Sequence, residues 1–411
     1  MMIKELQEKY AKVILSVCLK IKENQPLFIS ANSQVNDFVR IIATEAYELG
    51  VKDIYFDLVD VYLKHDALKN LTEDELKDSQ YWNKTKWNEY AQKDAAFLML
   101  ASETPELMND ISKEKINNMI TYSLNTRRPF DERREKNEIA WCIAAVPTIE
   151  WAKQVFPKSE NPVEDLWQKI FYICHITENN PERVWDDKIN KLSRRGQKLT
   201  SYQFQDLIYQ SSNGTNFKIS LPQNHIWCSG KEKLKNGLEV LVNFPTEEIF
   251  TSPTNDSASG IIYSSKPLSY QDSIIDEFWL KFENGEVTKF GAKKGEDSLK
   301  QLLNSCQNIN RIGEVALVEY DSPISNTNLV YYETLFDENS SCHLALGDSF
   351  AECIKEGTNK TKDELSQSKL NNCLNHVDFM IGTKDLKIVG ITKDKKEITI
   401  IENGNFTKEF K

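Results

Sequence analysis

The sequence predicts a two-domain protein of mixed class, in which an α/β domain spans residues 1–185 and a β-rich α+β domain spans residues 186–411. At 411 residues the chain exceeds the length that one hydrophobic core ordinarily supports. Strand-like apolar runs alternate with helical patterns in the first part, which is typical of a parallel sheet with crossover helices. In the second part, Asn-Gly pairs separate strand-like runs, and this arrangement indicates antiparallel hairpins.

The first domain opens with a predicted amphipathic helix over residues 4–21, where five apolar residues recur at helical spacing: Leu6, Tyr10, Val13, Val17 and Ile21. A short strand is predicted at residues 27–29. Ser33 is expected to cap the following helix, and Gly50 is placed to end it. Residues 54–58 form the next predicted strand, so strand, helix and strand follow in the order of a right-handed crossover.

Two further apolar runs, residues 95–101 and 139–146, have few polar interruptions, as expected for parallel strands that are covered on both faces. Pro147 ends the second run, and a helix through Trp151 and Val155 is expected to follow it. No predicted strand is followed by a glycine-rich phosphate loop, so the sequence does not support nucleotide binding.

Three Asn-Gly pairs in the second domain each lie between strand-like runs: Asn213-Gly214, Asn284-Gly285 and Asn403-Gly404. Asn and Gly accept positive φ angles, which the tight turns of two-residue hairpins need. We therefore expect a mainly antiparallel second domain, with a helix near residues 298–303. No internal repeat and no low-complexity linker divides the chain.

The composition limits the classes of binding partner and indicates the cellular compartment that we expect. A formal net charge of −11 disfavours a general nucleic-acid binder or a binder of anionic membranes, because both partners are polyanions. The apolar run at residues 13–19 is broken by Ser16 and flanked by charged residues, so neither a signal peptide nor a membrane span is expected. Eight cysteines without a C-x-x-C pair indicate reduced thiols, and a cytoplasmic location is expected.

The C-terminal part of the chain carries a cluster of residues suited to metal binding, because two of the five histidines adjoin acidic residues there. Asp337 and Glu338 precede His343, and His376 is followed at the second position by Asp378. If this last segment is a strand, His376 and Asp378 point to the same face. Imidazole nitrogen and carboxylate oxygen together suit zinc, cobalt, manganese and iron.

Four patches of the second domain combine into one predicted site: residues 243–248, 313–317, 337–343 and 376–382. A pair of divalent cations needs several carboxylates, one of which usually bridges, with neutral imidazoles in the remaining positions. An isolated acidic residue is more often a solvated surface group, so the inference depends on the combination. The six residues that meet the need are Glu248, Glu314, Glu338, His343, His376 and Asp378.

Beyond these residues, an ordered set of motifs resembles the thermophilic aminopeptidase family of metallopeptidases. The matching blocks of the second domain are PTEE at 245–248, FTSP at 250–253, KPL at 266–268, GEVALV at 313–318, DSPIS at 321–325, LFDEN at 335–339, HLALG at 343–347 and HVDFMIG at 376–382. Residues 127–129, 151–152 and 156–157 are also similar, so the resemblance spans nearly the whole chain.

This resemblance implies a cytoplasmic, typically homodimeric exopeptidase that releases N-terminal residues from short peptide substrates. It also implies two divalent ions, of zinc, cobalt, manganese or magnesium, that activate water. Motif matching gives Glu248 and Glu314 the places of the two glutamate ligands, and either is expected to act as the general base. Four residues match the remaining ligands: Glu338, His343, His376 and Asp378. Glu247 adjoins Glu248, so a shift of one residue stays open.

One position departs from the family pattern. Seven residues after His343 the family usually carries a tyrosine, whereas this chain has Phe350. Phenylalanine has no hydroxyl to donate to an oxyanion or to approach a metal. A metal-binding family member with impaired or no peptidase activity is therefore the alternative to a working aminopeptidase.

Other interpretations of the same residues also stay open. A mononuclear iron oxygenase could use His343, His376 and one acid, although it would leave the other acids without a role. Cys342 could be a nucleophile next to His343, but neighbouring residues of a strand point to opposite faces. No partner Asn or Asp for such a thiol is evident in the sequence.

Overall fold

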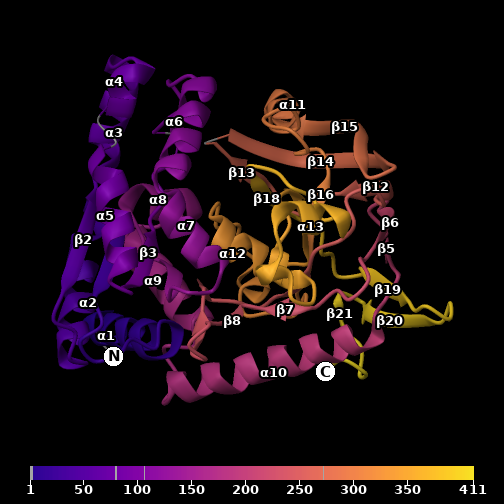
Figure 1. The fold of residues 1–411 in the computed structure, drawn as a ribbon, viewed down its shortest axis with the longest axis horizontal. Coiled ribbons are helices and arrows are strands. Elements are labelled where there is room, and N and C mark those ends of the chain that lie inside the picture. Colours follow the sequence, from indigo (N-terminus) through magenta and orange to yellow (C-terminus); the bar gives the residue numbers. More distant parts are fainter. Residues whose placement is uncertain (1–2, 79–80, 106, 272) are drawn as a thin grey trace. The chain divides into compact units, whose positions relative to one another are not determined.

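The computed structural model describes residues 3–78, 81–105, 107–271 and 273–411 (Figure 1). Its residues form two compact units. The first unit is Met1–Asp187 with Lys231–Pro245, and the second is Lys188–Gly230 with Thr246–Lys411. The sequence assigns residues 231–245 to the second domain, whereas in the structure they cluster with the first unit.

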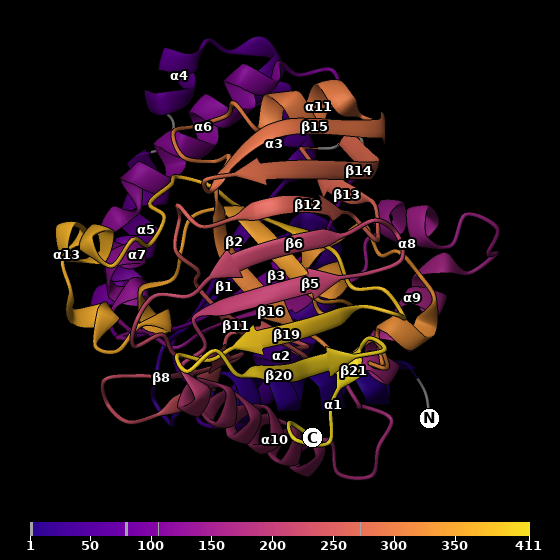
Figure 2. The same cartoon turned by 90° about the vertical axis from the view of Figure 1, so that its right-hand side faces the viewer.

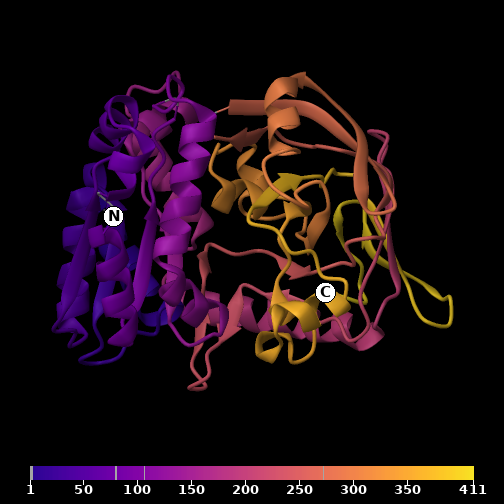
Figure 3. The same cartoon turned by 45° about the horizontal axis from the view of Figure 1, so that its top comes forward.

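The first unit contains a five-stranded parallel sheet in the order β10-β4-β3-β1-β2, which confirms the predicted α/β arrangement. Its strands are β1 (Leu27–Asn32), β2 (Ile54–Val59), β3 (Ala96–Ala101), β4 (Trp141–Ala145) and β10 (Asn243–Phe244). Nearly continuous burial along β1, β3 and β4 agrees with a sheet that is covered on both faces. Figure 3 shows the helices of this unit beside its strands, in indigo and purple.

The helices of the first unit are α1 (Ile3–Val13), α2 (Asn36–Glu48), α3 (Val61–Asn70), α4 (Glu73–Asp78), α5 (Tyr81–Gln92), α6 (Lys113–Thr126), α7 (Arg128–Glu135), α8 (Ile149–Val155) and α9 (Pro162–Ile173). A short hairpin of β8 (Lys231–Lys233) and β9 (Glu239–Leu241) belongs to the same unit. Helix α10 (Pro181–Tyr202) begins in the first unit and ends in the second. Within the described ranges, no helix combines the length and the apolar character that a membrane span requires.

Local chemistry explains where the first helices begin and end. The predicted helix over residues 4–21 is α1 followed by one π-helical turn, Ile14–Cys18. The expected cap at Ser33 is wrong, because the side chain of Asn32 accepts the hydrogen bond from the N–H of Gln34, and Ser33 lies in a short 3-10 turn. Gly50 follows α2 with a φ of +85°, a left-handed conformation that glycine adopts without strain.

The second unit contains a nine-stranded sheet in the order β13-β14-β12-β6-β5-β19-β20-β21, with β15 paired to β14 (Figure 2). Its strands are β5 (Asp206–Gln210), β6 (Asn216–Ser220), β12 (Ser259–Tyr263), β13 (Leu268–Tyr270), β14 (Ser273–Glu283), β15 (Glu286–Lys294), β19 (Lys387–Ile391), β20 (Glu397–Glu402) and β21 (Asn405–Phe406). All three predicted Asn-Gly hairpins are present, between β5 and β6, between β14 and β15, and between β20 and β21.

A second antiparallel sheet in this unit has the order β18-β17-β16-β11-β7. Its strands are β7 (Cys228–Ser229), β11 (Ile249–Thr251), β16 (Ile312–Leu317), β17 (His343–Gly347) and β18 (His376–Met380). The helices of the unit are α11 (Glu296–Leu302), α12 (Thr334–Glu338) and α13 (Lys362–Gln367).

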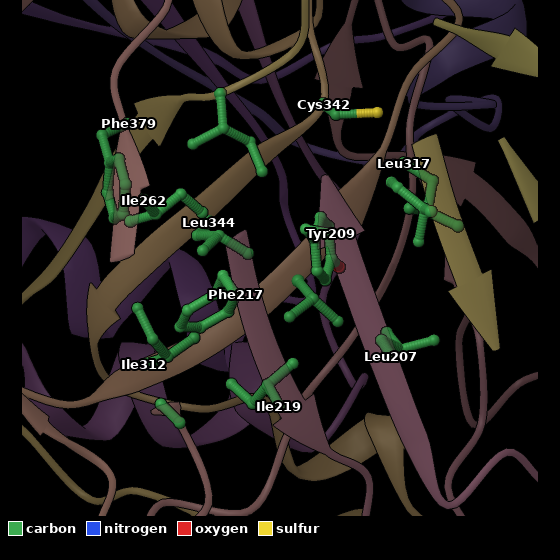
Figure 4. Packing of buried hydrophobic residues seen from close by; sticks show 14 of the residues in the cluster. Leu207, Tyr209, Phe217, Ile219, Ile262, Ile312, Leu317, Cys342, Leu344 and Phe379 are labelled. Carbon is green, nitrogen blue, oxygen red and sulfur yellow. The ribbon is translucent and has the colours of Figure 1, made fainter. Parts of the chain in front are cut away.

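The two sheets of the second unit share one apolar core (Figure 4). Leu207 and Phe217 reach it from the nine-stranded sheet, and Leu317, Leu344 and Phe379 reach it from the five-stranded sheet. Side chains alternate between the faces of a strand, so the five-stranded sheet keeps a second face free for polar residues.

Candidate metal centre

Strand alternation places the histidines of the five-stranded sheet on the face opposite to the apolar core. Leu344 of β17 and Phe379 of β18 belong to the core. Their neighbours His343 and Asp378 therefore point to the other face, and so does His376, which lies two residues before Asp378. The predicted strand at the His-x-Asp segment is β18, and the two side chains do meet.

Cross-strand register brings an acid from a third strand to the same place. Ala345 of β17 pairs with Glu314 of β16 on one side and with Asp378 of β18 on the other. Ala316 of β16 pairs in the same way with His343. Both alanines are buried and small, so they leave room between the longer polar side chains.

The polar side chains form two groups of three donors, and in each group the ligand atoms lie within 4.8 Å of one another. The first group is Glu248, Glu314 and His343, and the second is Glu314, His376 and Asp378. Glu314 therefore belongs to both groups. A carboxylate has two oxygens and can bind a cation with each, so the arrangement fits two cations that share Glu314.

Hydrogen bonds fix the orientation of both histidines. Nδ1 of His343 lies 3.0 Å from the carbonyl oxygen of Ser341, and Nδ1 of His376 lies 2.9 Å from that of Asp348. A carbonyl oxygen can only accept, so each Nδ1 carries the proton of the neutral ring. Nε2 of each ring then keeps its lone pair and faces the carboxylates, as a metal ligand requires.

The carboxylates favour a positive charge at both Nε2 atoms. Nε2 of His343 lies 3.1 Å from Glu248 Oε2, and Nε2 of His376 lies 2.9 Å from Glu314 Oε2. Burial lowers the pKa of His343, but the hydrogen bond and charge of Glu248 outweigh burial and raise this pKa to about 9. Burial also lowers the pKa of His376, which Asp378 and Glu314 raise well above its usual range. A metal ion can supply the same positive charge as a proton at these positions.

Glu338 lies outside both donor groups but belongs to the same cluster of buried carboxylates. It is the last residue of α12 and is only 8% exposed. Burial, followed by the negative charges of Asp378 and Glu248, raises its pKa well above the usual range. Within the described part of the chain, Glu248, Glu314 and Asp378 form ion pairs with histidine alone, and Glu338 forms none. A buried carboxylate cluster with so little cationic compensation fits a divalent metal centre.

The neighbouring Glu247 has a different partner. Its carboxylate forms an ion pair with Lys188 of α10. Burial raises the pKa of Glu247, and the charge of Lys188 opposes that rise. Among the described residues, Glu248 is the member of this pair that lies within a donor group.

Phe350 packs directly on the cluster. Its ring centroid is 4.8 Å from that of His376 and 5.5 Å from that of Phe250. The two rings are tilted by 46° to each other, and Phe350 is 37% exposed, so part of its ring meets solvent. The ring offers no hydroxyl to the neighbouring donor groups.

Cys342 does not belong to the cluster. It is buried in the apolar core, and its thiol donates a hydrogen bond to the carbonyl oxygen of Val318 at 3.1 Å. Burial raises the pKa of this thiol to about 12, which leaves almost no thiolate near neutral pH. The geometry therefore argues against a cysteine nucleophile next to His343.

The backbone carbonyls of Ser341 and Asp348 are parts of the site that sequence reasoning missed. Both orient a histidine, but any residue type supplies a carbonyl group. Only the course of the chain just before β17 (for Ser341) and just after it (for Asp348) brings these oxygens to the rings. No sequence signal marks them.

Comparison with known proteins identifies the family. Residues 3–406 match the family described as thermophilic metalloprotease (M29). Aminopeptidase 2 of Geobacillus stearothermophilus is 36% identical over 408 residues, which cover 99% of this chain and 98% of that protein. Aminopeptidase AmpS of Bacillus subtilis is 35% identical over 399 residues, which cover 97% of each chain.

Two solved structures are similar to the fold. Wild-type AmpT from Thermus thermophilus matches with a TM-score of 0.92 at 28% identity, covering 99% of this chain and 100% of that one. A 2,5-dihydroxypyridine dioxygenase from Pseudomonas putida matches with a TM-score of 0.52 at 12% identity, covering 100% of both chains. At 12% identity this second likeness shows the fold alone.

These findings confirm both the predicted mixed fold and the resemblance to thermophilic aminopeptidases. The family match covers nearly the whole chain, and the relatives above 30% identity are aminopeptidases. The chain therefore belongs to the thermophilic metalloprotease family M29 and is a metalloaminopeptidase.

Proposed function

We propose that this metalloaminopeptidase holds two divalent ions and uses them to release N-terminal residues from short peptides. The observation that carries the proposal is the position of Glu314, which belongs to both donor groups of the cluster. One carboxylate between two sets of donors is what a pair of cations with a common ligand needs.

The ligands divide naturally between the two ions. Glu248, His343 and Glu314 would hold the first ion. Glu314, His376 and Asp378 would hold the second. Nitrogen and oxygen donors of this kind suit zinc, cobalt and manganese, and the carboxylates also suit magnesium.

Peptide hydrolysis also needs a group that moves a proton. Bound divalent ions lower the pKa of water and polarise a carbonyl group. A carboxylate has to take the proton from the attacking water and pass it to the leaving amine. Glu248 and Glu314 are the predicted bases, and Glu338 is a third candidate because it lies outside both donor groups and has a raised pKa. A carboxylate shared by two ions has no oxygen left for the proton, so we favour Glu248 or Glu338 over Glu314.

The ring of Phe350 favours a second candidate function. It packs on His376 at the place where a hydroxyl donor is usual in the family, and it supplies no such donor. A family member that binds metal but cleaves peptides slowly or not at all would have this feature. The two candidates differ in turnover and not in metal binding.

The homodimer and the cytoplasmic location that the family resemblance implies remain predictions. Sedimentation equilibrium decides the first, because a dimer has twice the 47.5 kDa mass of the chain. Fractionation of the source cells decides the second.

The proposed activity is tested with a leucine-linked chromogenic amide and with a matched pair of short peptides, one free and one N-acetylated. Each is assayed before chelation, after chelation, and after zinc or cobalt is restored. An aminopeptidase cleaves the free peptide, spares the acetylated one, and loses and regains activity with the metal. Cleavage of both peptides, or activity that chelation leaves intact, would contradict the proposal.

A further inference from the structure

We propose that Asn339 is a positioning residue that holds the carboxylate of Glu338 and the chain next to Glu248 in one arrangement. The inference rests on the proposed function, because it concerns residues of the metal cluster. Asn339 follows α12 directly and is fully buried. Its side chain makes three hydrogen bonds, and two of them reach segments that carry cluster residues.

The hydrogen bonds leave one possible orientation of the amide. Oδ1 of Asn339 accepts from the backbone N–H of Glu247 at 2.7 Å. Nδ2 donates to the carbonyl oxygen of Leu335 at 2.9 Å and to Oε1 of Glu338 at 3.2 Å. The reverse orientation would place an NH₂ group against an N–H and a carbonyl oxygen against two acceptors.

These contacts connect two distant parts of the sequence. The N–H of Glu247 is one residue before Glu248, which belongs to the first donor group. Nδ2 provides the only hydrogen bond to the Glu338 carboxylate within the part of the chain that the structure describes. Glu338 is surrounded by other carboxylates, so without this donor its side chain would turn away from them. Groups that orient ligands commonly change metal affinity by about 10–100-fold.

The test compares Asn339→Ala with Asn339→Asp. Zinc affinity is measured by competition with a chromogenic chelator, and the unfolding temperature is measured on the metal-free protein. Aspartate keeps the acceptor for the N–H of Glu247 but replaces the donor to Glu338 with a negative charge. We expect both variants to bind zinc about 10–100-fold more weakly than the wild type.

Thr215→Val is the matched control. Thr215 is 3% exposed, and its hydroxyl accepts from the N–H of Tyr263 at 3.1 Å in the nine-stranded sheet. This variant is expected to lower the unfolding temperature and to leave zinc affinity unchanged. An Asn339→Asp protein with wild-type zinc affinity would overturn the positioning role, because the residue would then only hold the turn. A wild-type protein that binds no zinc would instead overturn the proposed function itself.

A different observation supports a second proposal, which does not depend on the metal centre. We infer that Cys306 and Cys373 form an oxidisable thiol pair that becomes an intramolecular disulfide. Their sulfur atoms lie 3.1 Å apart, and both residues are partly exposed. Cys306 lies between α11 and β16, and Cys373 lies just before β18. The disulfide would therefore link the segments that precede these two strands, which carry residues of the candidate metal centre.

The chemistry is a two-electron oxidation by a peroxide. The thiolate of one cysteine attacks the peroxide oxygen and becomes a sulfenic acid with release of one water molecule, and the second thiol displaces the other water as the S–S bond forms. Burial raises the pKa of the Cys373 thiol to about 12, and Cys306 adds to this effect. Either sulfur can react first, because the same disulfide forms in both cases.

The test is hydrogen peroxide treatment of the full chain, followed by thiol counting and peptide mass mapping. The expected result is a loss of two of the eight thiols, a linked peptide pair containing Cys306 and Cys373, and an unfolding temperature higher by about 5 °C. Cys373→Ser is expected to show neither the link nor the rise. Cys18 and Cys142 also lie together but are fully buried, so they serve as an internal comparison. Oxidation that leaves Cys306 and Cys373 unlinked would overturn the inference.

Discussion

Glu314→Gln is the substitution that separates a shared ligand from an ordinary one. Glutamine keeps the shape of glutamate, so the variant removes the charge without opening a cavity. Glu314 belongs to both donor groups, whereas Glu248 belongs to one. Loss of a group that only orients a ligand costs about 10–100-fold in affinity, so loss of a ligand should cost at least about 100-fold, or about 2.7 kcal/mol, for each ion that it holds.

The assay is metal content after dialysis at a free metal concentration about ten times the wild-type dissociation constant. Under that condition an unperturbed ion site is about 90% filled, and a site weakened 100-fold is about 10% filled. The Glu314→Gln protein should therefore lose most of the metal from both sites, while the matched variant Glu248→Gln should keep one ion. A Glu314→Gln protein that keeps one ion would refute the shared ligand, and so would equal losses in the two variants.

Three other substitutions test the roles of Glu338, His225 and Phe350. Glu338→Gln should raise the unfolding temperature of the metal-free protein, because burial and the surrounding carboxylates disfavour the charge of Glu338. The same variant should bind metal more weakly. A lower unfolding temperature would contradict this prediction. His225→Asn tests a buried neutral histidine whose pKa burial lowers from 6.5 to about 4. The unfolded chain takes up the proton first, so the stability that the neutral ring contributes is complete above pH 6.5 and is lost as the pH falls toward 4. In urea unfolding, the wild type should lose about 2 kcal/mol more than the variant between pH 7 and pH 5, and equal losses would refute the assignment. Phe350→Tyr should raise kcat about tenfold or more with little change in KM, because it restores a hydroxyl donor; an unchanged kcat would mean that the ring only packs on His376.

Much of the fold was predictable because local chemistry decides it. Asn284-Gly285 and Asn403-Gly404 have positive φ at both residues, and Asn213-Gly214 has it at the glycine; all three predicted hairpins are present. The cap of the 3-10 turn that precedes α2 was not predictable, because Asn32 and Ser33 are adjacent and both have capping side chains. The pairing of β10 with β4 is a contact between residues about 100 apart in sequence, and a two-residue strand carries no pattern that reveals its partner.

Some features of the candidate site were likewise predictable from the sequence, and others were not. Alternation along a strand predicts that His376 and Asp378 share a face, and their side chains do meet. The sharing of Glu314 between two donor groups depends on the register of three strands around Ala345, which the sequence alone does not reveal. The role of Asn339 depends on where the chain near Glu247 passes, and no local pattern marks it.

The most direct test of the proposed two-metal centre is a metal count on the wild-type chain. The purified protein is stripped with a chelator, loaded with zinc or cobalt, desalted and analysed by elemental mass spectrometry together with protein concentration. We predict two ions per chain. One ion per chain would contradict the shared role of Glu314, and a single iron in the protein as isolated would favour a mononuclear centre instead.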